Sequence, residues 1–203
     1  MDRLKDPKVI GPGIWYIIHL KGMIAKDIST KVSFIKLINE LSVNFPCLNC
    51  RNHINQYLEH NPITLATLNE PEGLFKWSWE FHNAVNKRLG KNIVDYQSAK
   101  RLNSDINKIG PGIWYLIHMK AALVEDIPSK VSFIIFIEEL SVYVPNMNNL
   151  ANFINKHPID KDVLYWSWKL HDYINRILGK KSVDYELVKK AFHGSEVCTN
   201  CGE

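Results

Sequence analysis

The chain contains one sequence twice, and this internal repeat constrains its fold more than any other feature. Four blocks recur in the same order: GPGIWYIIHLK at 11–21 and GPGIWYLIHMK at 110–120, KVSFIKLINELSV at 31–43 and KVSFIIFIEELSV at 130–142, WSWEFHNAVNKRLGK at 77–91 and WSWKLHDYINRILGK at 166–180, VDYQSAK at 94–100 and VDYELVK at 183–189. A repeat of this length predicts two copies of one structural unit.

The two copies differ in length between the second and third blocks. The offset is 99 residues for the first two blocks and 89 for the last two, so the second copy is ten residues shorter. The segment PITLATLNEPEGLFK is reduced there to PIDKDVLY. We therefore expect a first domain over 1–104, a second over 105–192 and a tail over 193–203.

Apolar residues recur at helical spacing in each copy, and no alternating pattern typical of strands competes. In the first copy Gly11 and Pro12 are expected to open a helix, because proline is tolerated in a first turn. One apolar stripe is expected from Val32, Ile35, Ile38, Leu41 and Phe45. Later elements are expected as helices at 52–60, 72–89 and 95–102 and a loop at 61–73. The prediction is an all-α fold of two tandem four-helix bundles, each with a short fifth helix.

Composition and charge exclude several classes of protein. Hydrophobic residues make up 46% of the chain and charged residues 23%, as in ordinary soluble domains. The net charge of +4 is scattered along the chain, so no nucleic-acid-binding surface is expected. No apolar run approaches the about 18 residues of a membrane span, and the N-terminus lacks the apolar core of a secretory signal. We expect a cytoplasmic protein with no membrane or nucleic-acid partner.

All four cysteines lie in two Cys-x-x-Cys pairs, Cys47–Cys50 and Cys198–Cys201. Such a pair is typical of a redox disulfide, half of a zinc site or two buried thiols, and a cytosolic chain favours metal or redox chemistry. The repeat argues against simple burial, because the second copy has VPNMNN where the first has FPCLNC, between similar helices. Cys47 follows Pro46 at the start of a helix, where unpaired N–H groups favour a thiolate.

A second stripe, polar and aromatic, runs along the helix expected at 72–89. Its members recur at spacings of three and four residues: Trp79, His82, Asn83 and Asn86. The first helix repeats this chemistry with Trp15 and His19. A single residue of this kind is most simply a partly buried aromatic or solvated polar group, but several on one face favour a planar ligand. With the cysteine pair facing them, the ligand expected is a planar redox cofactor.

Three motifs of the first copy resemble the Erv/ALR family of FAD-linked sulfhydryl oxidases. HNAVNKRLGK is similar to its His-Asn-x-Val-Asn-x-x-Leu-Gly-Lys motif, GPGIWYIIH to its Gly-x-x-x-Trp-x-x-x-His opening, and FPCLNCRNH to its Pro-Cys-x-x-Cys-x-x-His segment. The motifs occur in family order over nearly all of residues 11–96. The short versions from large DNA viruses are closest in style, which implies a location in host cytoplasm or in a virion.

The resemblance implies an FAD-dependent thiol oxidase that forms disulfides in protein dithiols and reduces O₂ to H₂O₂. Cys50 would face the flavin and Cys47 would be attacked by incoming thiols, so Cys47 has to be accessible. The cofactor-binding residues implied are Gly11, Trp15, His19, His53, Trp79, His82, Asn83, Val85, Asn86 and Lys91. No metal ligand is implied.

Two positions depart from the family pattern. Pro12 stands where the family often has arginine, and Val94-Asp95-Tyr96 stands where it often has Phe-Asp-Cys. The second departure removes a structural disulfide, so helix packing alone is expected to anchor the short fifth helix.

The second copy is expected to have lost disulfide exchange. Asparagines stand at the positions of both active-site cysteines and of His53, namely Asn146, Asn149 and Asn152. The copy keeps Trp114, His118, Trp168, His171, Asn175 and Lys180, while Asp172 replaces Asn83. Either it still binds FAD without turning it over, or these residues only fill a core.

The family commonly forms homodimers through its early helices. The corresponding segments here, 30–43 and 129–142, are among the best matched between the copies. We therefore expect the two copies to pack as an intramolecular pseudo-dimer, with a further homodimer possible.

The tail pair Cys198–Cys201 has two interpretations. The resemblance implies a shuttle that carries electrons from substrate to Cys47–Cys50 and then to FAD, and the alternative is an exposed, accidental motif or a metal half-site. The competing function for the whole chain is a non-catalytic helical scaffold or a zinc-binding interaction module.

Overall fold

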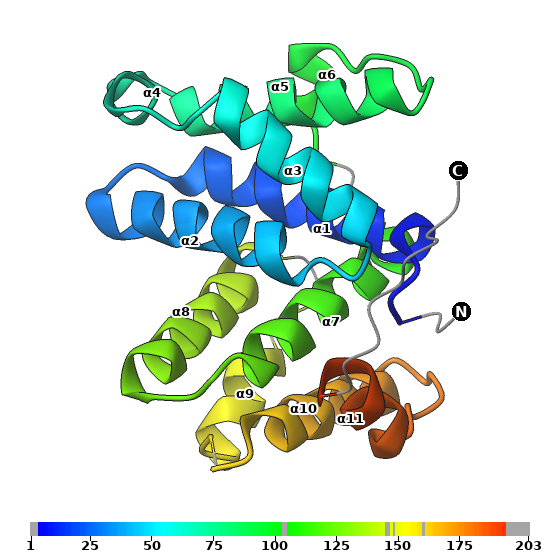
Figure 1. Cartoon of the computed structure of the whole chain (residues 1–203). Coiled ribbons are helices and arrows are strands. Elements are labelled where there is room, and N and C mark those ends of the chain that lie inside the picture. Colours follow the sequence, from blue (N-terminus) through cyan, green and yellow to red (C-terminus); the bar gives the residue numbers. More distant parts are fainter. Residues whose placement is uncertain (1–3, 103–104, 145–146, 148, 160, 194–203) are drawn as a thin grey trace. The chain divides into compact units, whose positions relative to one another are not determined.

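The computed structural model describes residues 4–102, 105–144, 147, 149–159 and 161–193. These residues contain eleven helices and no strand, so the all-α prediction is confirmed (Figure 1). No helix in this part of the chain is both long enough and apolar enough to cross a membrane.

The first copy supplies six of these helices: α1 (Pro7–Ile24), α2 (Ile28–Asn44), α3 (Leu48–His60), α4 (Leu65–Asn69), α5 (Gly73–Arg88) and α6 (Tyr96–Lys100). The start of α1 differs from the prediction, which placed it at Gly11. The helix begins at Pro7 because the carbonyl of Asp6 accepts the amides of Val9 and Ile10, at 2.9 Å each. Proline is well suited to this first position, since its missing N–H would have no helical partner there.

The second copy supplies the other five: α7 (Ile106–Ala122), α8 (Ile127–Tyr143), α9 (Asn149–Lys156), α10 (Val163–Ile177) and α11 (Tyr185–His193). The segment 61–73 of the first copy was expected to be a loop, but it contains α4, which Thr64 caps. No counterpart of α4 occurs among the described residues of the second copy, and α9 has 8 residues where α3 has 13. The length difference between the copies is therefore divided between the third helix and the loop that follows it.

The helices α2 and α8 begin with the same capping box. The carboxylate of Asp27 accepts the Thr30 amide at 2.9 Å, and the Thr30 hydroxyl accepts the Asp27 amide at 3.2 Å. Asp126 and Ser129 repeat both contacts in the second copy. This reciprocal pairing satisfies two amide groups that a helix start leaves without partners.

Glycines determine two features of the fold. Gly90 and Gly179 follow the ends of α5 and α10 with φ of +64°, a conformation that glycine adopts without strain, and the predicted stop at Gly90 is confirmed. Gly22 lets α1 approach α5 closely, since a Cβ added there would lie 2.9 Å from the Cα of Phe75. This close approach sets the distance between the two helices that carry most of the candidate site.

The buried face of α2 is rotated from the predicted stripe. Val32 was expected in the core but is 56% exposed. The apolar side chains that α2 buries are Phe34, Leu37, Ile38 and Leu41. The prediction at Val32 was wrong because the face that packs against neighbouring helices is centred on Phe34 and Leu37, a rotation that a short apolar pattern does not fix.

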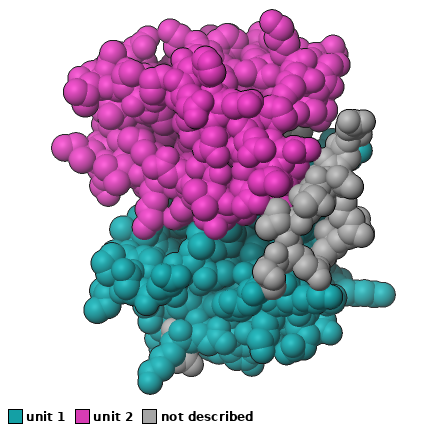
Figure 2. Space-filling model, in the orientation of Figure 1, with its two compact units in different colours: residues 1–11, 104–196 teal, residues 12–103, 197–203 magenta. Residues whose placement is uncertain are grey.

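The described residues form two compact units (Figure 2). One unit contains residues 12–102, and the other contains residues 4–11 and 105–193. Helix α1 belongs to both, because its first turn lies in the unit of the second copy. The expected pseudo-dimer packing of the two copies stays a prediction.

A polar clamp anchors α6 at the place of the missing family disulfide. Glu72 accepts a hydrogen bond from the hydroxyl of Tyr96 at 3.0 Å and pairs with the ammonium of Lys100 at 2.6 Å. The Tyr96 ring also packs edge-on against Phe75 and Trp79. The expectation that helix packing alone anchors α6 was therefore incomplete, since one carboxylate joins the helix to the start of α5.

Candidate active site

The cysteine pair lies at the start of α3. Cys47 is the N-cap of the helix, and its Sγ accepts the amide of Cys50 at 3.2 Å, while both thiols are free. This confirms that Cys47 meets an unpaired first-turn N–H. Cys47 is only 1% exposed, however, and Cys50 is partly exposed. The expectation of an accessible Cys47 is therefore wrong, because its sulfur lies against the first turn of α3, where it accepts the Cys50 amide.

The environment of Cys50 favours the neutral thiol. Burial, together with the hydrogen bond and charge of Cys47, raises the pKa of Cys50 to about 12. The guanidinium of Arg88, at the end of α5, acts in the opposite direction and lowers this pKa. Arg88 is thus a positive group whose charge favours the thiolate of Cys50.

A relay of three hydrogen-bonded side chains, Ser78, His19 and His82, links α1 to α5. The Ser78 hydroxyl donates to the carbonyl of Phe75 at 2.7 Å, so its oxygen is left to accept from Nδ1–H of His19 at 2.9 Å. Nε2 of His19 then carries no proton and accepts from Nδ1–H of His82 at 2.9 Å. This order fixes the tautomer of both rings and leaves Nε2 of His82 as a hydrogen-bond acceptor.

Both histidines are neutral and one of them forms a flat aromatic surface. Burial lowers the pKa of His19 to about 4, and burial with the charges of His19 and Lys91 lowers that of His82 to about 3. The rings of Trp15 and His82 stack with centroids 4.1 Å apart and planes within 4°. The structure thus brings together Trp15, His19 and His82, as the sequence predicted.

Ser78 is a member of this cluster that the sequence did not reveal. It is completely buried and lies one turn before His82 on α5. Its one available signal was the repeat, in which Ser167 stands at the same place before His171. The sequence around a helical serine does not indicate its hydrogen-bond partner, so this signal was weak.

Trp79 and Asn83 have their polar atoms engaged by the protein itself. Trp79 Nε1–H donates to the carbonyl of Val94 at 2.7 Å, and Asn83 donates to the same oxygen at 2.8 Å. Asn83 also accepts the amide of Val94 at 3.0 Å. These contacts hold the segment that leads from α5 to α6 and includes Lys91, so both residues position that segment.

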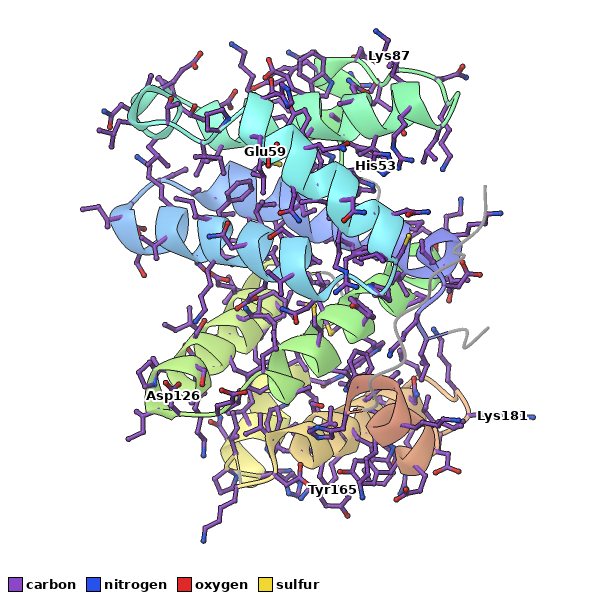
Figure 3. All side chains as sticks on the ribbon, in the orientation of Figure 1. His53, Glu59, Lys87, Asp126, Tyr165 and Lys181 are labelled. Carbon is purple, nitrogen blue, oxygen red and sulfur yellow. The ribbon has the colours of Figure 1, made fainter. Side chains whose placement is uncertain are left out.

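The remaining predicted residues differ in their surroundings. His53 lies on α3 one turn after Cys50 (Figure 3), and its Nδ1 is buried without a hydrogen-bond partner in the described structure. Asn86 is buried on α5, and Val85 beside it is partly exposed. At Gly11 an added Cβ would meet no atom within 4 Å, so protein packing alone does not require glycine there.

Comparison with known proteins identifies the family. The model of the Erv1 / Alr family matches residues 12–104. FAD-linked sulfhydryl oxidases of two African swine fever virus isolates, Kenya/KEN-50 and Malawi/Lil 20-1, are each 36% identical over 95 residues, which are 45% of this chain and 77% of the relative. The chain belongs to the Erv1/Alr family.

Further Erv1/Alr relatives also come from large DNA viruses. The putative FAD-linked sulfhydryl oxidase 088R of Frog virus 3 is 28% identical over 112 residues, covering 52% of this chain and 73% of the relative. The putative FAD-linked sulfhydryl oxidase 347L of Invertebrate iridescent virus 6 is 27% identical over 106 residues, covering 47% and 93%. No solved structure gives a significant match. The predicted family is confirmed, and its model covers the copy that carries Cys47 and Cys50.

The second copy of this Erv1/Alr protein keeps the relay of the first. His118 pairs with the Ser167 hydroxyl at 2.8 Å and with Nδ1 of His171 at 3.0 Å, and Ser167 donates to a helix carbonyl at 2.7 Å. Trp114 and His171 stack with centroids 3.9 Å apart and planes within 9°. The relay and the stacked pair thus do not depend on the cysteines.

Two predicted features lie outside the described residues, the tail pair Cys198–Cys201 and Asn146. Within the described part no group of three or more histidine, cysteine or acidic side chains is arranged to hold a metal ion. The zinc-site alternative therefore depends on residues beyond the described ranges.

Proposed function

We propose that this Erv1/Alr protein is an FAD-linked thiol oxidase that oxidises protein dithiols to disulfides. Two substrate thiols lose two electrons and two protons, and O₂ accepts both as H₂O₂. The observation that supports this most is that Cys47 and Cys50 lie in the copy that the family model matches, while relatives of that copy are named FAD-linked sulfhydryl oxidases.

Several residues of the first copy suit FAD. A flat ring can stack on the Trp15–His82 pair, and the buried Nδ1 of His53 lacks a partner that a polar edge of a ligand could supply. Lys91 offers a positive charge to a pyrophosphate. When bound, FAD supplies a two-electron acceptor that O₂ can reoxidise.

The cysteines carry out the thiol chemistry. A thiolate of the tail pair or of a small dithiol attacks the Cys47 sulfur of the Cys47–Cys50 disulfide, which forms a mixed disulfide and releases Cys50 as a thiolate. The second thiol of the same dithiol then displaces Cys47, so that dithiol leaves as a disulfide and both electrons stay on the reduced pair. Because Cys47 is buried, an incoming thiolate can reach its sulfur only when the first turn of α3 opens locally.

The protein also controls protons near the cofactor. Ser78 and His19 hold the neutral ring of His82 with its Nε2 as an acceptor, so this atom can take a hydrogen bond from a ligand N–H or O–H. Arg88 is the positive charge that favours a thiolate at Cys50 when the pair gives up its electrons.

The tail pair supplies the substrate-facing step in this proposal. Cys198 and Cys201 exchange with the protein substrate and then with Cys47–Cys50, so electrons pass from tail to active site to FAD. The proposed place of action is host cytoplasm or a virion.

Oxygen consumption by the purified full chain tests the proposal. We expect a yellow protein that oxidises dithiothreitol and makes one H₂O₂ for each O₂ consumed. Cys47→Ser and Cys50→Ser abolish the reaction, while a Cys198→Ser/Cys201→Ser variant keeps it with dithiothreitol and loses it with protein dithiols. A colourless protein after incubation with FAD, or oxidation that survives Cys50→Ser, would overturn the proposal.

A further inference from the structure

The unit of the second copy contains a cavity of about 280 Å³ at the place that matches the candidate active site of the first. Its wall includes Trp114 and His118 of α7, His171 and Asn175 of α10, and Lys180 just after α10. A packed core would leave few voids larger than a water molecule. The retained residues therefore do more than fill a core, since they surround open space.

The size of the cavity limits the ligand. Its volume lies near the lower end of the range of about 300–1,000 Å³ typical of small-molecule sites. Leu4, Val9 and Ile10, which belong to the same unit, line part of it. The enclosed space suits one ring system and the groups next to it, so the rest of a larger nucleotide would lie outside the enclosed volume.

The chemistry of the wall specifies the ligand class. The stacked rings of Trp114 and His171 offer a flat surface, and the hydrogen-bond chain through His118 and Ser167 leaves Nε2 of His171 as an acceptor. The ammonium of Lys180 reaches Oδ1 of Asn107 at 3.3 Å, and both residues line the cavity. A planar ring with N–H donors that also carries an anionic group matches this arrangement.

The acidic substitution in this copy does not oppose an anionic ligand. Asp172 replaces Asn83 of the first copy, but its Oδ2 pairs with Arg176 at 2.8 Å. Its Oδ1 is buried without a partner, where Asn83 accepts a backbone amide, and Asp172 is not among the residues that line the cavity. The added negative charge is thus compensated on its own helix, away from the wall.

The cavity also lacks the means to exchange electrons with thiols. Met147 lines it near the positions of the lost cysteines, and Asn149 begins α9 where Cys50 lies in α3. No described residue of this unit is a cysteine. A ligand held there is not reduced by a dithiol of its own unit.

We propose that this cavity is a second, non-redox nucleotide site that binds a flavin or adenine nucleotide through stacking on Trp114 and phosphate contact with Lys180. This site goes beyond the proposed oxidase function, which concerns the first copy alone. Its binding can be measured whether or not the chain oxidises thiols.

One change at the cavity wall and a matched pair of lysines provide the test. Gly110 lines the cavity and a Cβ added there meets no atom within 4 Å, so Gly110→Leu blocks the second site without a clash at Cβ. Lys180→Glu, at an exposed residue, removes the phosphate contact with little risk to folding. Lys91→Glu is the corresponding change in the first copy, because Lys91 is also exposed and lies in the other unit.

The measurement is the number of FAD molecules per full chain, followed by calorimetric titration of ADP into the FAD-saturated protein. If FAD is the ligand, the wild type holds two FAD and Gly110→Leu holds one. If a free adenine nucleotide is the ligand, the wild type holds one FAD and binds one ADP, and Gly110→Leu loses the ADP but keeps the FAD. In both cases Lys180→Glu weakens binding at the second site about tenfold or more, and Lys91→Glu leaves that site unchanged.

Two results would overturn the proposal. One is a wild-type chain that holds at most one FAD and binds no ADP after saturation. The other is a second equivalent of nucleotide that persists unchanged in both Gly110→Leu and Lys180→Glu. A failed oxidase assay leaves these binding results readable, so the two proposals fail separately.

Discussion

Nε2 of His19 lies 2.9 Å from Nδ1 of His82, and the same contact recurs at 3.0 Å between His118 and His171. In each copy a buried serine orients the first ring through its other nitrogen. The relay therefore orients the second ring before any ligand arrives, and it is independent of the cysteine pair that only the first copy has.

Ser78→Ala tests the relay in the first copy. Nδ1–H of His19 loses its acceptor and becomes a buried unpaired donor, which costs about 1–3 kcal/mol of folding stability. We expect weaker FAD binding and a shifted visible spectrum of the bound flavin, because His82 is no longer held in one tautomer. Ser167→Ala is the matched control, with a similar loss in denaturant unfolding but unchanged oxidase kinetics. Equal effects of the two variants on the kinetics would contradict this account.

We expect acid to destabilise the folded chain already at pH values above those at which its carboxylates titrate. The pKa of His19 is about 4 and those of His82 and His118 are about 3, against 6.5 for an unburied histidine. The unfolded chain therefore binds more protons than the folded one below about pH 6.5, so stability falls as pH decreases. We expect a loss of about 1–2 kcal/mol for each fully buried histidine between pH 7 and pH 5, measured by urea unfolding. Constant stability over this interval would show that the histidines are not buried as described.

Gly22→Ala tests the close approach of α1 to α5. The added Cβ would lie 2.9 Å from the Cα of Phe75, so backbone has to move, and we expect a loss of about 1–3 kcal/mol of stability. Ala121 occupies the matching position of α7, and Ala121→Gly is expected to cost only about 1 kcal/mol through helix propensity. Because His19 lies one turn before Gly22, the first variant should also weaken FAD binding and the second should not. A Gly22→Ala protein more stable than wild type would contradict this packing.

Electron transfer from the reduced cysteine pair should accelerate with pH. With a pKa of about 12 for Cys50, its thiolate fraction rises about tenfold for each pH unit between 7 and 9. We expect the anaerobic rate of flavin reduction to follow this rise. Arg88→Gln should lower the rate at every pH, because it removes the positive charge near Cys50. Lys87→Gln is the control at the adjacent exposed residue, and equal slowing by both variants would argue against a specific role of Arg88.

Much of the fold followed from periodicity and repetition. The helical class, the stop at Gly90 and the grouping of Trp15 with His82 were predicted, because each depends on local spacing or on a conformational preference of one residue. The rotation of α2 was not predicted, and Val32 is exposed, since an apolar stripe defines a face only to within a fraction of a turn.

The missed features of the site depend on tertiary contacts. Trp79 and Asn83 both donate to the backbone of Val94, which lies in a later segment, while their expected contact with the cofactor stays a prediction. Cys47 was expected to be accessible, but it caps α3 with its own sulfur. Partners brought together by folding leave no spacing pattern in the sequence, so these contacts could only be found in the structure.

The electron path is tested most directly by the anaerobic reaction of the FAD-loaded full chain with dithiothreitol, followed through the visible absorbance of the flavin. We expect rapid bleaching in the wild type and in Asn149→Ser, which changes the matching position of the second copy. We expect no bleaching on the same timescale in Cys50→Ser. Bleaching of Cys50→Ser at the wild-type rate would show that electrons do not reach FAD through the Cys47–Cys50 pair.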